Sequence, residues 1–204
     1  MSHVKNLQEI RERARQHIMN GAVTEDYSLN KEQAVAILNE ALATELVCVL
    51  RYKFHYYMAT GIHSGAAKEE FLEHAKEEQE HADQIAERIK QLGGKPEMNP
   101  AGLTARSHSE YKEGSSVVEM LKEDLIAERI AIESYREMIQ FFGDKDSTTR
   151  RMLEEILAVE EEHADDIADL LFAQAGDEDT RRLYYQDEVP GQSKAGSKVD
   201  KTAN

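Results

Sequence analysis

The stretch Glu78-Gln79-Glu80-His81-Ala82-Asp83-Gln84-Ile85-Ala86 has a near copy later in the chain, Glu160-Glu161-Glu162-His163-Ala164-Asp165-Asp166-Ile167-Ala168. The two stretches match at seven of nine positions, and each contains the pattern Glu-x-x-His. Residues three apart lie on one face of a helix, so each copy presents a carboxylate and an imidazole together. Two such helices side by side could hold two metal ions between them.

Four long segments of the chain have helical periodicity, and none of the three prolines interrupts them. Asn30 is a candidate N-cap for the first segment, and the spacing from Ser116 to Glu119 suits a capping box at the start of the third. At about 1.5 Å per residue these helices are rods of about 40 Å, the scale of a long four-helix bundle. The predicted helices span residues 31–60, 66–92, 116–142 and 147–174.

The connections between these helices predict the topology. Residues 61–65 and 143–146 are short, so the first and second helices, and the third and fourth, should pair antiparallel. Residues 93–115 are long enough to return along the whole bundle, which makes one long crossover between the second and third helices. The expected fold is an all-α four-helix bundle over residues 31–175. It is preceded by a partly helical extension over residues 1–30, with a short helix within 7–19, and followed by a tail over 176–204.

Two further glutamates, Glu45 and Glu128, interrupt the apolar stripes of the first and third helices. All four glutamates lie near the middle of their helices, so they should fall in one buried layer. Four buried carboxylates with only two histidines repel one another unless cations are present. The intervals also repeat, because Glu45 to Glu78 is 33 residues and Glu128 to Glu160 is 32. Tyr52 and Tyr135 each follow their glutamate by seven.

One Glu-x-x-His alone is weak evidence, because eight histidines in a glutamate-rich chain produce about one such pattern by chance. A solvated helix face explains either copy taken singly. Two copies, two core-phase glutamates and matching intervals together favour a metal site. Its predicted ligands are Glu45, Glu78, His81, Glu128, Glu160 and His163.

This pattern resembles the ferritin-like superfamily, and most closely bacterioferritin, over roughly residues 31–172. The motifs that carry the resemblance are Glu45-Leu46-Val47 with Tyr52, Glu78-x-x-His81-Ala82-Asp83, Asp124-Leu125-x-x-Glu128 and Glu160-x-x-His163. The resemblance implies that Glu45 and Glu128 are terminal ligands, that Glu78 and Glu160 bridge the metals, and that His81 and His163 each bind one ion. It also implies that Tyr52 bonds to a ligand carboxylate and that Asp124 orients a ligand imidazole.

The chain departs from bacterioferritins at one position. They carry a methionine, the axial ligand of a haem shared by paired subunits, directly after the second helix's ligand glutamate. This chain has Gln79 there, so no haem is expected. The expected cofactors are two iron ions per subunit, with manganese as the alternative.

The resemblance implies a ferroxidase that oxidises Fe(II) with O₂ or H₂O₂ and stores iron in a homo-oligomeric shell. Two alternatives stay open. The first is a di-iron or di-manganese peroxidase or catalase without storage, and the second is a metal-free helical stress or assembly protein. The metal, the oxidant, the storage of mineral and the number of subunits also stay open.

Composition excludes several classes of protein. A net charge of −15 and a pI of about 5.0 argue against a nucleic-acid partner. The DNA-protecting relatives of ferritins are set aside too, because their metal site lies between subunits and uses another pattern of His and Asp. Cys48 is alone, which excludes an intrachain disulfide and fits the cytoplasm and a core position.

The sequence predicts neither a secretory leader nor a membrane span. The remaining polar candidates lack matched partners and are expected to play no part in the site. They are His55, His63, His74 and His108, together with Glu73 and Glu77 as solvent-facing acids.

Overall fold

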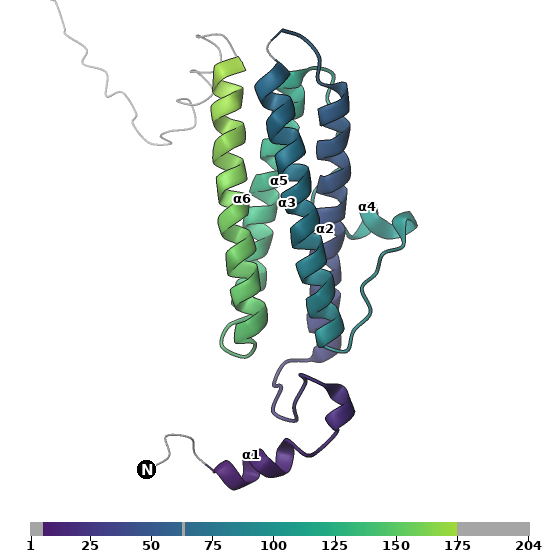
Figure 1. Cartoon of the computed structure of the whole chain (residues 1–204), viewed down its shortest axis with the longest axis vertical. Coiled ribbons are helices and arrows are strands. Elements are labelled where there is room, and N and C mark those ends of the chain that lie inside the picture. The colour runs from purple at the N-terminus through teal and green to yellow at the C-terminus, as the bar shows by residue number, and fades with distance from the viewer. Residues whose placement is uncertain (1–5, 63, 175–204) are drawn as a thin grey trace, which may run out of the picture.

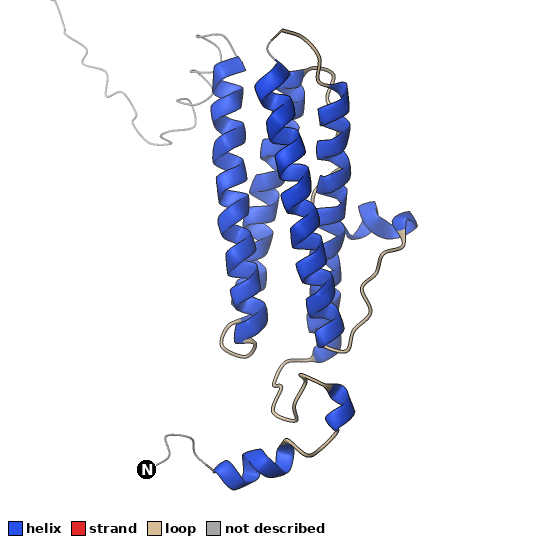
Figure 2. Ribbon diagram, in the orientation of Figure 1, coloured by secondary structure: helices blue, strands red, loops and turns tan. Residues whose placement is uncertain are grey.

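A computed structural model describes residues 6–62 and 64–174. Four long helices make up its body: α2 (Lys31–Met58), α3 (Ser64–Gln91), α5 (Val117–Phe142) and α6 (Ser147–Gln174). They run side by side in one bundle (Figure 1), and every regular element among the described residues is helical (Figure 2). The predicted all-α four-helix bundle is therefore confirmed, with helix ends that differ from the predicted ones by at most two residues.

Local sequence signals explain where these helices begin and end. The Asn30 side chain accepts a hydrogen bond from the Gln33 amide at 2.7 Å, and Ser116 accepts one from the Glu119 amide at 3.2 Å. Gly143 follows α5 with φ of 45°, a left-handed value that favours glycine. These caps satisfy backbone groups that a helix end leaves without partners.

The long crossover between α3 and α5 is partly ordered by its own short elements. It contains a 3₁₀ turn (Pro100–Gly102) and α4 (Leu103–Arg106), which lies against the outside of α2 (Figure 1). Leu103 packs on Ala43 and Val47 of α2. The Asn39 side chain also holds the crossover, because it donates to the Lys95 carbonyl at 3.2 Å and accepts from the Glu97 amide at 2.7 Å.

The N-terminal extension is less compact than the bundle. Its helix α1 (Leu7–Arg13) has no buried side chain and lies beyond one end of the bundle (Figure 1). It is shorter than the predicted stretch of 7–19, which continues only as a 3₁₀ turn (Ile18–Asn20) after His17 takes a left-handed φ of 44°. The predicted tail over 176–204 and His63 lie outside the described residues.

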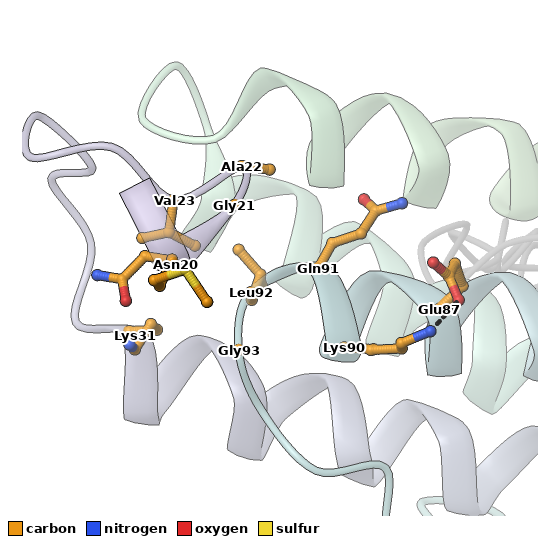
Figure 3. A pocket seen from close by; sticks show the side chains of 11 residues that line it. Asn20, Gly21, Ala22, Val23, Lys31, Glu87, Lys90, Gln91, Leu92 and Gly93 are labelled. Carbon is orange, nitrogen blue, oxygen red and sulfur yellow. Dashed lines mark ion pairs between the residues drawn. The ribbon is translucent and has the colours of Figure 1, made fainter. Parts of the chain in front are cut away.

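A pocket of about 400 Å³ lies where this extension meets the bundle (Figure 3). Residues 19–23 form one side of it, and residues 87–93 at the end of α3 form another, with Lys31 at its edge. None of its lining residues belongs to the predicted ligand set. The pocket is therefore separate from the candidate site.

One described helix, α2, is long and apolar enough to cross a membrane by length and composition alone. Its apolar composition is explained by its place in the bundle, because it packs against α3, α4 and α5. Two charged side chains near its middle, Glu45 and Arg51, are fully or almost fully buried against protein. We therefore treat α2 as a core helix of the bundle.

The apolar core consists of two clusters, and the predicted ligands come from the positions between them. One cluster fills the end near the α5–α6 turn, with Leu38, Leu42, Ile85, Ile89, Phe142, Leu153 and Ile156 among its members. The other fills the opposite end, with Cys48, Tyr52, Phe71, Leu121 and Ile167. The buried cysteine is thus a core residue, as expected. A polar layer thus lies between two apolar clusters.

Asp146, just before α6, ties three parts of the fold together. Its carboxylate accepts hydrogen bonds from the Thr149 amide at 2.9 Å, from Arg88 of α3 at 2.9 Å and from the Tyr27 hydroxyl at 3.0 Å. Burial alone raises the pKa of Asp146, but the hydrogen bonds from Thr149 and the charge of Arg88 outweigh burial and lower that pKa below its ordinary value. The ionised form therefore stabilises the fold.

We expect Asp146→Asn to lower the free energy of unfolding by about 1–3 kcal/mol at pH 7 in metal-free protein. A carboxylate with a lowered pKa contributes stability above its unfolded pKa of about 3.9, and this is lost as the pH falls through the folded pKa. The difference between variant and parent should therefore shrink when urea unfolding is repeated near pH 3. Asp144→Asn is the control, since that exposed carboxylate pairs only with Arg150 at the surface. An equal difference at both pH values contradicts the role of charge.

Candidate metal centre

The six predicted ligands meet in one buried layer across the four long helices. Each is at most 4% exposed. Helix α2 supplies Glu45 and α5 supplies Glu128, while α3 and α6 each supply one Glu-x-x-His pair. Every long helix therefore contributes one carboxylate near its middle.

The layer divides into two groups of four side chains whose ligand atoms lie within 4.8 Å of one another. One group is Glu45, Glu78, His81 and Glu160, and the other is Glu78, Glu128, Glu160 and His163. Glu78 and Glu160 belong to both groups. This is the arrangement expected for two metal ions that share two carboxylates, each ion also holding one carboxylate and one imidazole of its own.

Both imidazoles turn the same ring nitrogen toward these carboxylates. His81 Nδ1 lies 3.0 Å from Glu160, 3.5 Å from Glu45 and 3.5 Å from Glu78. His163 Nδ1 is 3.8 Å from both Glu78 and Glu160 and 3.9 Å from Glu128. The wider spacing around His163 exceeds hydrogen-bond distance and suits an ion placed between the groups.

Seven buried side-chain atoms in this layer make no hydrogen bond. They are Glu45 Oε2, Glu78 Oε1, His81 Nδ1, Glu128 Oε2, both carboxylate oxygens of Glu160, and His163 Nδ1. A buried polar atom without a partner costs about 1–3 kcal/mol, so such a concentration in one place needs an explanation. Each of the six predicted ligands contributes at least one such atom, and carboxylate oxygen with imidazole nitrogen is a donor set for iron or manganese. The residues present therefore fit two metal ions.

The pKa shifts of the side chains in the layer also favour bound cations. Burial, followed by the charge of Glu160, raises the pKa of Glu78 and of Glu128 well above the ordinary value. Burial also acts to raise the pKa of Glu160, but contacts with His163 and His81 outweigh it and lower that pKa. His81 has its pKa raised to about 10, because Glu160 and Glu45 overcome the effect of burial. Ionisation of all four carboxylates is therefore favoured by positive charge in addition to that of the two imidazoles.

Two buried tyrosines hold the terminal carboxylates, and they do so across the bundle. The Tyr52 hydroxyl of α2 donates to Glu128 of α5, and the Tyr135 hydroxyl of α5 donates to Glu45 of α2. The predicted contact between Tyr52 and a ligand carboxylate is therefore present. Tyr135 was not predicted as a site residue, although its position seven residues after Glu128 repeats the spacing of Tyr52 after Glu45.

The resemblance implied that Asp124 orients a ligand imidazole, but the hydrogen bonds of Asp124 are made to other side chains. Its carboxylate instead accepts a hydrogen bond from Arg51 Nε at 2.7 Å and lies 2.7 Å from His55 Nδ1, with all three side chains completely buried. Arg51 and His55 also contact the crossover through the Glu110 and Lys112 carbonyls. This ion cluster fastens the crossover to α2 and α5, so His55 has a structural role that the sequence did not indicate.

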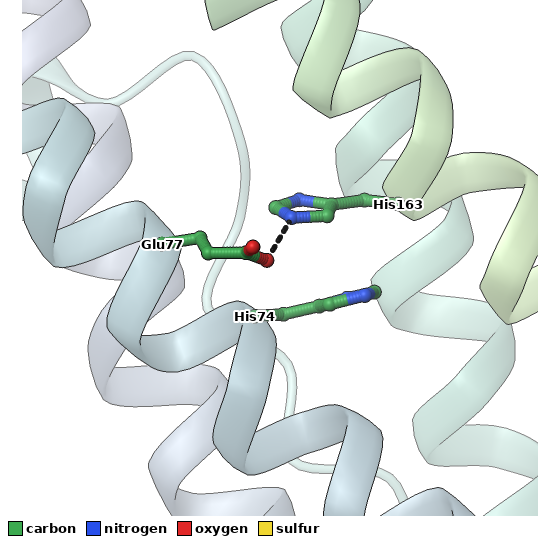
Figure 4. Close-up of side chains that lie close together, drawn as sticks. All are labelled: His74, Glu77 and His163. Atoms are coloured by element: carbon green, nitrogen blue, oxygen red, sulfur yellow. Dashed lines mark hydrogen bonds and ion pairs between the residues drawn. The ribbon is translucent and has the colours of Figure 1, made fainter.

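His74 and Glu77 were expected to play no part in the site, but both contact His163. The His74 ring is 1% exposed and stacks on the ring of His163, with centroids 3.9 Å apart. Glu77 lies 2.8 Å from His163 Nε2 (Figure 4), whereas Nδ1 of the same ring faces the layer. A carboxylate on the outer nitrogen of a ligand imidazole fixes the orientation of its ring. The sequence feature that could have indicated this role is the position of Glu77 directly before the predicted ligand Glu78.

This chain shares sequence with proteins of a known family. A family model described as Ferritin-like domain matches residues 35–173. A bacterioferritin from Desulfovibrio desulfuricans is 28% identical over 134 residues, which cover 65% of this chain and 71% of that protein. A nutrient stress-induced DNA-binding protein from Synechococcus is 31% identical over 139 residues, which cover 66% of this chain and 78% of that protein.

A solved structure is similar as well. The dodecameric thioferritin of Bacteroides fragilis, described as a bacterioferritin-related protein, matches with a TM-score of 0.69 and 31% identity, covering 79% of this chain and 94% of that one. The named DNA-binding relative corrects one prediction. The acidic net charge had been taken to rule out a nucleic-acid partner, and that exclusion is wrong, because net charge does not describe a local surface.

We expect Glu128→Gln to leave the melting temperature of metal-free protein close to that of the parent, because burial raises the pKa of Glu128 and favours a neutral, protonated carboxyl at this position. The same variant should gain less stability than the parent when Co(II) is added, because a more weakly bound ion stabilises the folded protein less. Thermal unfolding with and without Co(II) measures both effects. Glu133→Gln, an exposed position on the same helix, should behave as the parent does. Equal stabilisation of the Glu128→Gln variant and the parent by Co(II) contradicts a metal role for Glu128.

Proposed function

Because the chain belongs to the ferritin-like family, we propose that it is a ferroxidase that oxidises Fe(II) at the layer of six ligands and stores the Fe(III) product inside an oligomeric shell. Fe(II) is the substrate and O₂ or H₂O₂ is the oxidant. Glu45 and Glu128 are the terminal ligands, Glu78 and Glu160 are the shared ones, and each Fe(II) takes one imidazole, His81 or His163.

The observation that carries this proposal is the sharing of Glu78 and Glu160 by two groups of ligand atoms. Shared carboxylates hold two Fe(II) close enough to give up one electron each to the same oxidant. Two electrons and two protons reduce O₂ to H₂O₂, and two electrons and two protons reduce H₂O₂ to two molecules of water. A single isolated site supplies only one electron, so the paired arrangement matches the reaction.

The residues of the layer also manage protons and orientation. Burial raises the pKa of Glu78 and of Glu128 and so favours their protonated forms, which means that binding of Fe(II) to these carboxylates would release protons. The Tyr52 and Tyr135 hydroxyls keep Glu128 and Glu45 turned to the centre, and Glu77 keeps His163 turned to it. The apolar clusters on both sides limit the access of water to the layer.

Storage and assembly are part of the same proposal. The similarity to a structure described as dodecameric supports a homo-oligomeric shell. A peroxidase or catalase at the same centre is the alternative, and iron retained per particle after oxidation separates the two. Gln79, which donates to Asp83 at 3.0 Å, supports a centre without haem, and the lone buried Cys48 supports a cytoplasmic setting.

Glu78→Ala should reduce the initial rate of Fe(II) oxidation to that of buffer alone, because this variant removes a ligand from both ions. The appearance of Fe(III) absorbance after mixing with aerobic buffer measures the rate. Glu80→Ala is the matched control, since Glu80 lies two residues away in the same motif and is exposed. Undiminished oxidation by Glu78→Ala rejects the proposed centre.

DNA binding is a second candidate, favoured by the printed name of the Synechococcus relative. The extension around α1 is a candidate place for it, because Arg11, Arg13 and Arg15 are all exposed there. Lysine and arginine side chains bind DNA phosphates without reading sequence, and such binding weakens as salt rises.

Replacing Arg11, Arg13 and Arg15 together by Gln should abolish a gel shift of duplex DNA that the assembled parent produces at low salt. The same variant should oxidise Fe(II) at the parental rate, because α1 lies outside the bundle. Absence of any shift by the parent at low salt removes this second candidate.

A further inference from the structure

The repeat that builds the layer is broken at two positions just before its Glu-x-x-His motifs. One position before the motif, the first copy has Glu77 and the second copy has Val159. Four positions before the motif, the first copy has His74 and the second copy has Ile156. The first helical hairpin thus carries a carboxylate and an imidazole where the second carries two aliphatic side chains.

Both of these polar residues contact one ring, that of His163 on α6. Glu77 lies 2.8 Å from His163 Nε2, and the His74 ring stacks on the His163 ring with centroids 3.9 Å and planes 22° apart (Figure 4). A neutral imidazole whose Nε2 donates to a carboxylate has its lone pair on Nδ1, and Nδ1 of His163 faces the layer. The hydrogen bond therefore fixes which nitrogen is offered to a metal ion, and the stacked ring limits the tilt of the imidazole.

His74 also supports a second ligand of the same metal position. Its Nδ1 lies 3.3 Å from the Tyr52 hydroxyl, which is hydrogen-bonded to Glu128. Glu128 and His163 belong to the same group of four ligand side chains, and neither belongs to the other group. One buried imidazole thus contacts a ligand ring directly and reaches a ligand carboxylate through one hydroxyl.

The ring of His81, in the other group, has less support. Its Nδ1 faces three carboxylates of the layer, but within the described part of the chain no group forms a hydrogen bond or an ion pair with its Nε2. Its centroid is 6.2 Å from that of His163, and the two rings are tilted rather than stacked. The terminal carboxylates are each held by one tyrosine, so the two metal positions differ mainly in how their imidazoles are held.

We propose that His74 and Glu77 are positioning residues that preorganise one of the two metal positions, the one that includes His163. This position binds a divalent cation before, and more tightly than, the position that includes His81. Loss of the partner that orients a ligand imidazole costs about 10–100-fold in metal affinity, so the two affinities should differ by about tenfold or more. The inference rests on the proposed function, in which the second and weaker Fe(II) completes the two-electron pair.

The test compares two variants of the assembled, metal-free protein, each of which keeps one position intact. His81→Ala leaves the position of His163, and His163→Ala leaves the position of His81. Anaerobic titration with Co(II), followed by the visible absorption of the bound ion, should show at least about tenfold tighter binding of the first ion in His81→Ala. Repulsion between two ions does not enter, because only the first ion is compared. Equal affinity in the two variants shows that the positions are equivalent and overturns the inference.

The cause of the difference is tested in the His81→Ala background. Glu77→Val and His74→Ile, which copy the second hairpin, should each weaken the first Co(II) about tenfold or more. Glu77→Gln should bind more tightly than Glu77→Val, because its amide oxygen still accepts from Nε2 although the charge is gone. Glu80→Val is the matched control, since this exposed neighbour undergoes the same substitution. If neither Glu77→Val nor His74→Ile weakens the ion more than Glu80→Val does, these residues do not position the ligand and the inference is wrong.

Failure of this inference and failure of the ferroxidase proposal have different signatures. Co(II) binding that Glu78→Ala leaves unchanged rejects the metal centre and this inference with it. Two equally tight positions that Glu78→Ala weakens reject only the preference for one position. One tight and one weak position in a protein that does not oxidise Fe(II) reject the ferroxidase function and leave this inference standing.

Discussion

Burial of four carboxylates between two apolar clusters is the constraint on which the rest of this structure depends. A buried ionised carboxylate is unfavourable unless it is compensated, and the layer has only two imidazoles and two tyrosine hydroxyls to offer it. The bundle nevertheless keeps these groups in place, because each is fixed to a helix whose remaining inward positions are apolar. The buried carboxylates lower the stability of the fold at the centre of the bundle, and the apolar clusters at its two ends compensate for this cost.

The ion cluster of Arg51, Asp124 and His55 shows the opposite solution to the same problem. These charged groups are just as deeply buried, yet they are paired with one another and with carbonyl groups of the crossover. The paired charges fasten the crossover to the bundle, whereas several atoms of the carboxylate layer a few residues away make no hydrogen bond. The difference lies in partners and not in burial, which is why burial alone does not identify a site.

Much of this arrangement follows from the sequence, because long helices convert spacing into position. The apolar stripes around Glu45 and Glu128 and the repeated Glu-x-x-His predict both the four-helix bundle and the six side chains of the layer. Asp124 was misassigned, since its partners Arg51 and His55 come from another helix and no spacing within one helix reveals them. His74 and Glu77 were passed over for a related reason, as their roles depend on how α3 and α6 face each other. The exclusion of nucleic acid was wrong because it rested on total charge and on the pattern of the metal site, and neither describes the local surface.

The exchange of tyrosines between the two helical hairpins has a consequence for the two halves of the site. Tyr52 of the first hairpin holds Glu128 of the second, and Tyr135 of the second holds Glu45 of the first. Neither hairpin is complete alone, yet each carries one glutamate, one Glu-x-x-His and one tyrosine for its neighbour. The two halves of the bundle therefore depend on each other for the orientation of their terminal carboxylates, and the long crossover keeps them in one chain.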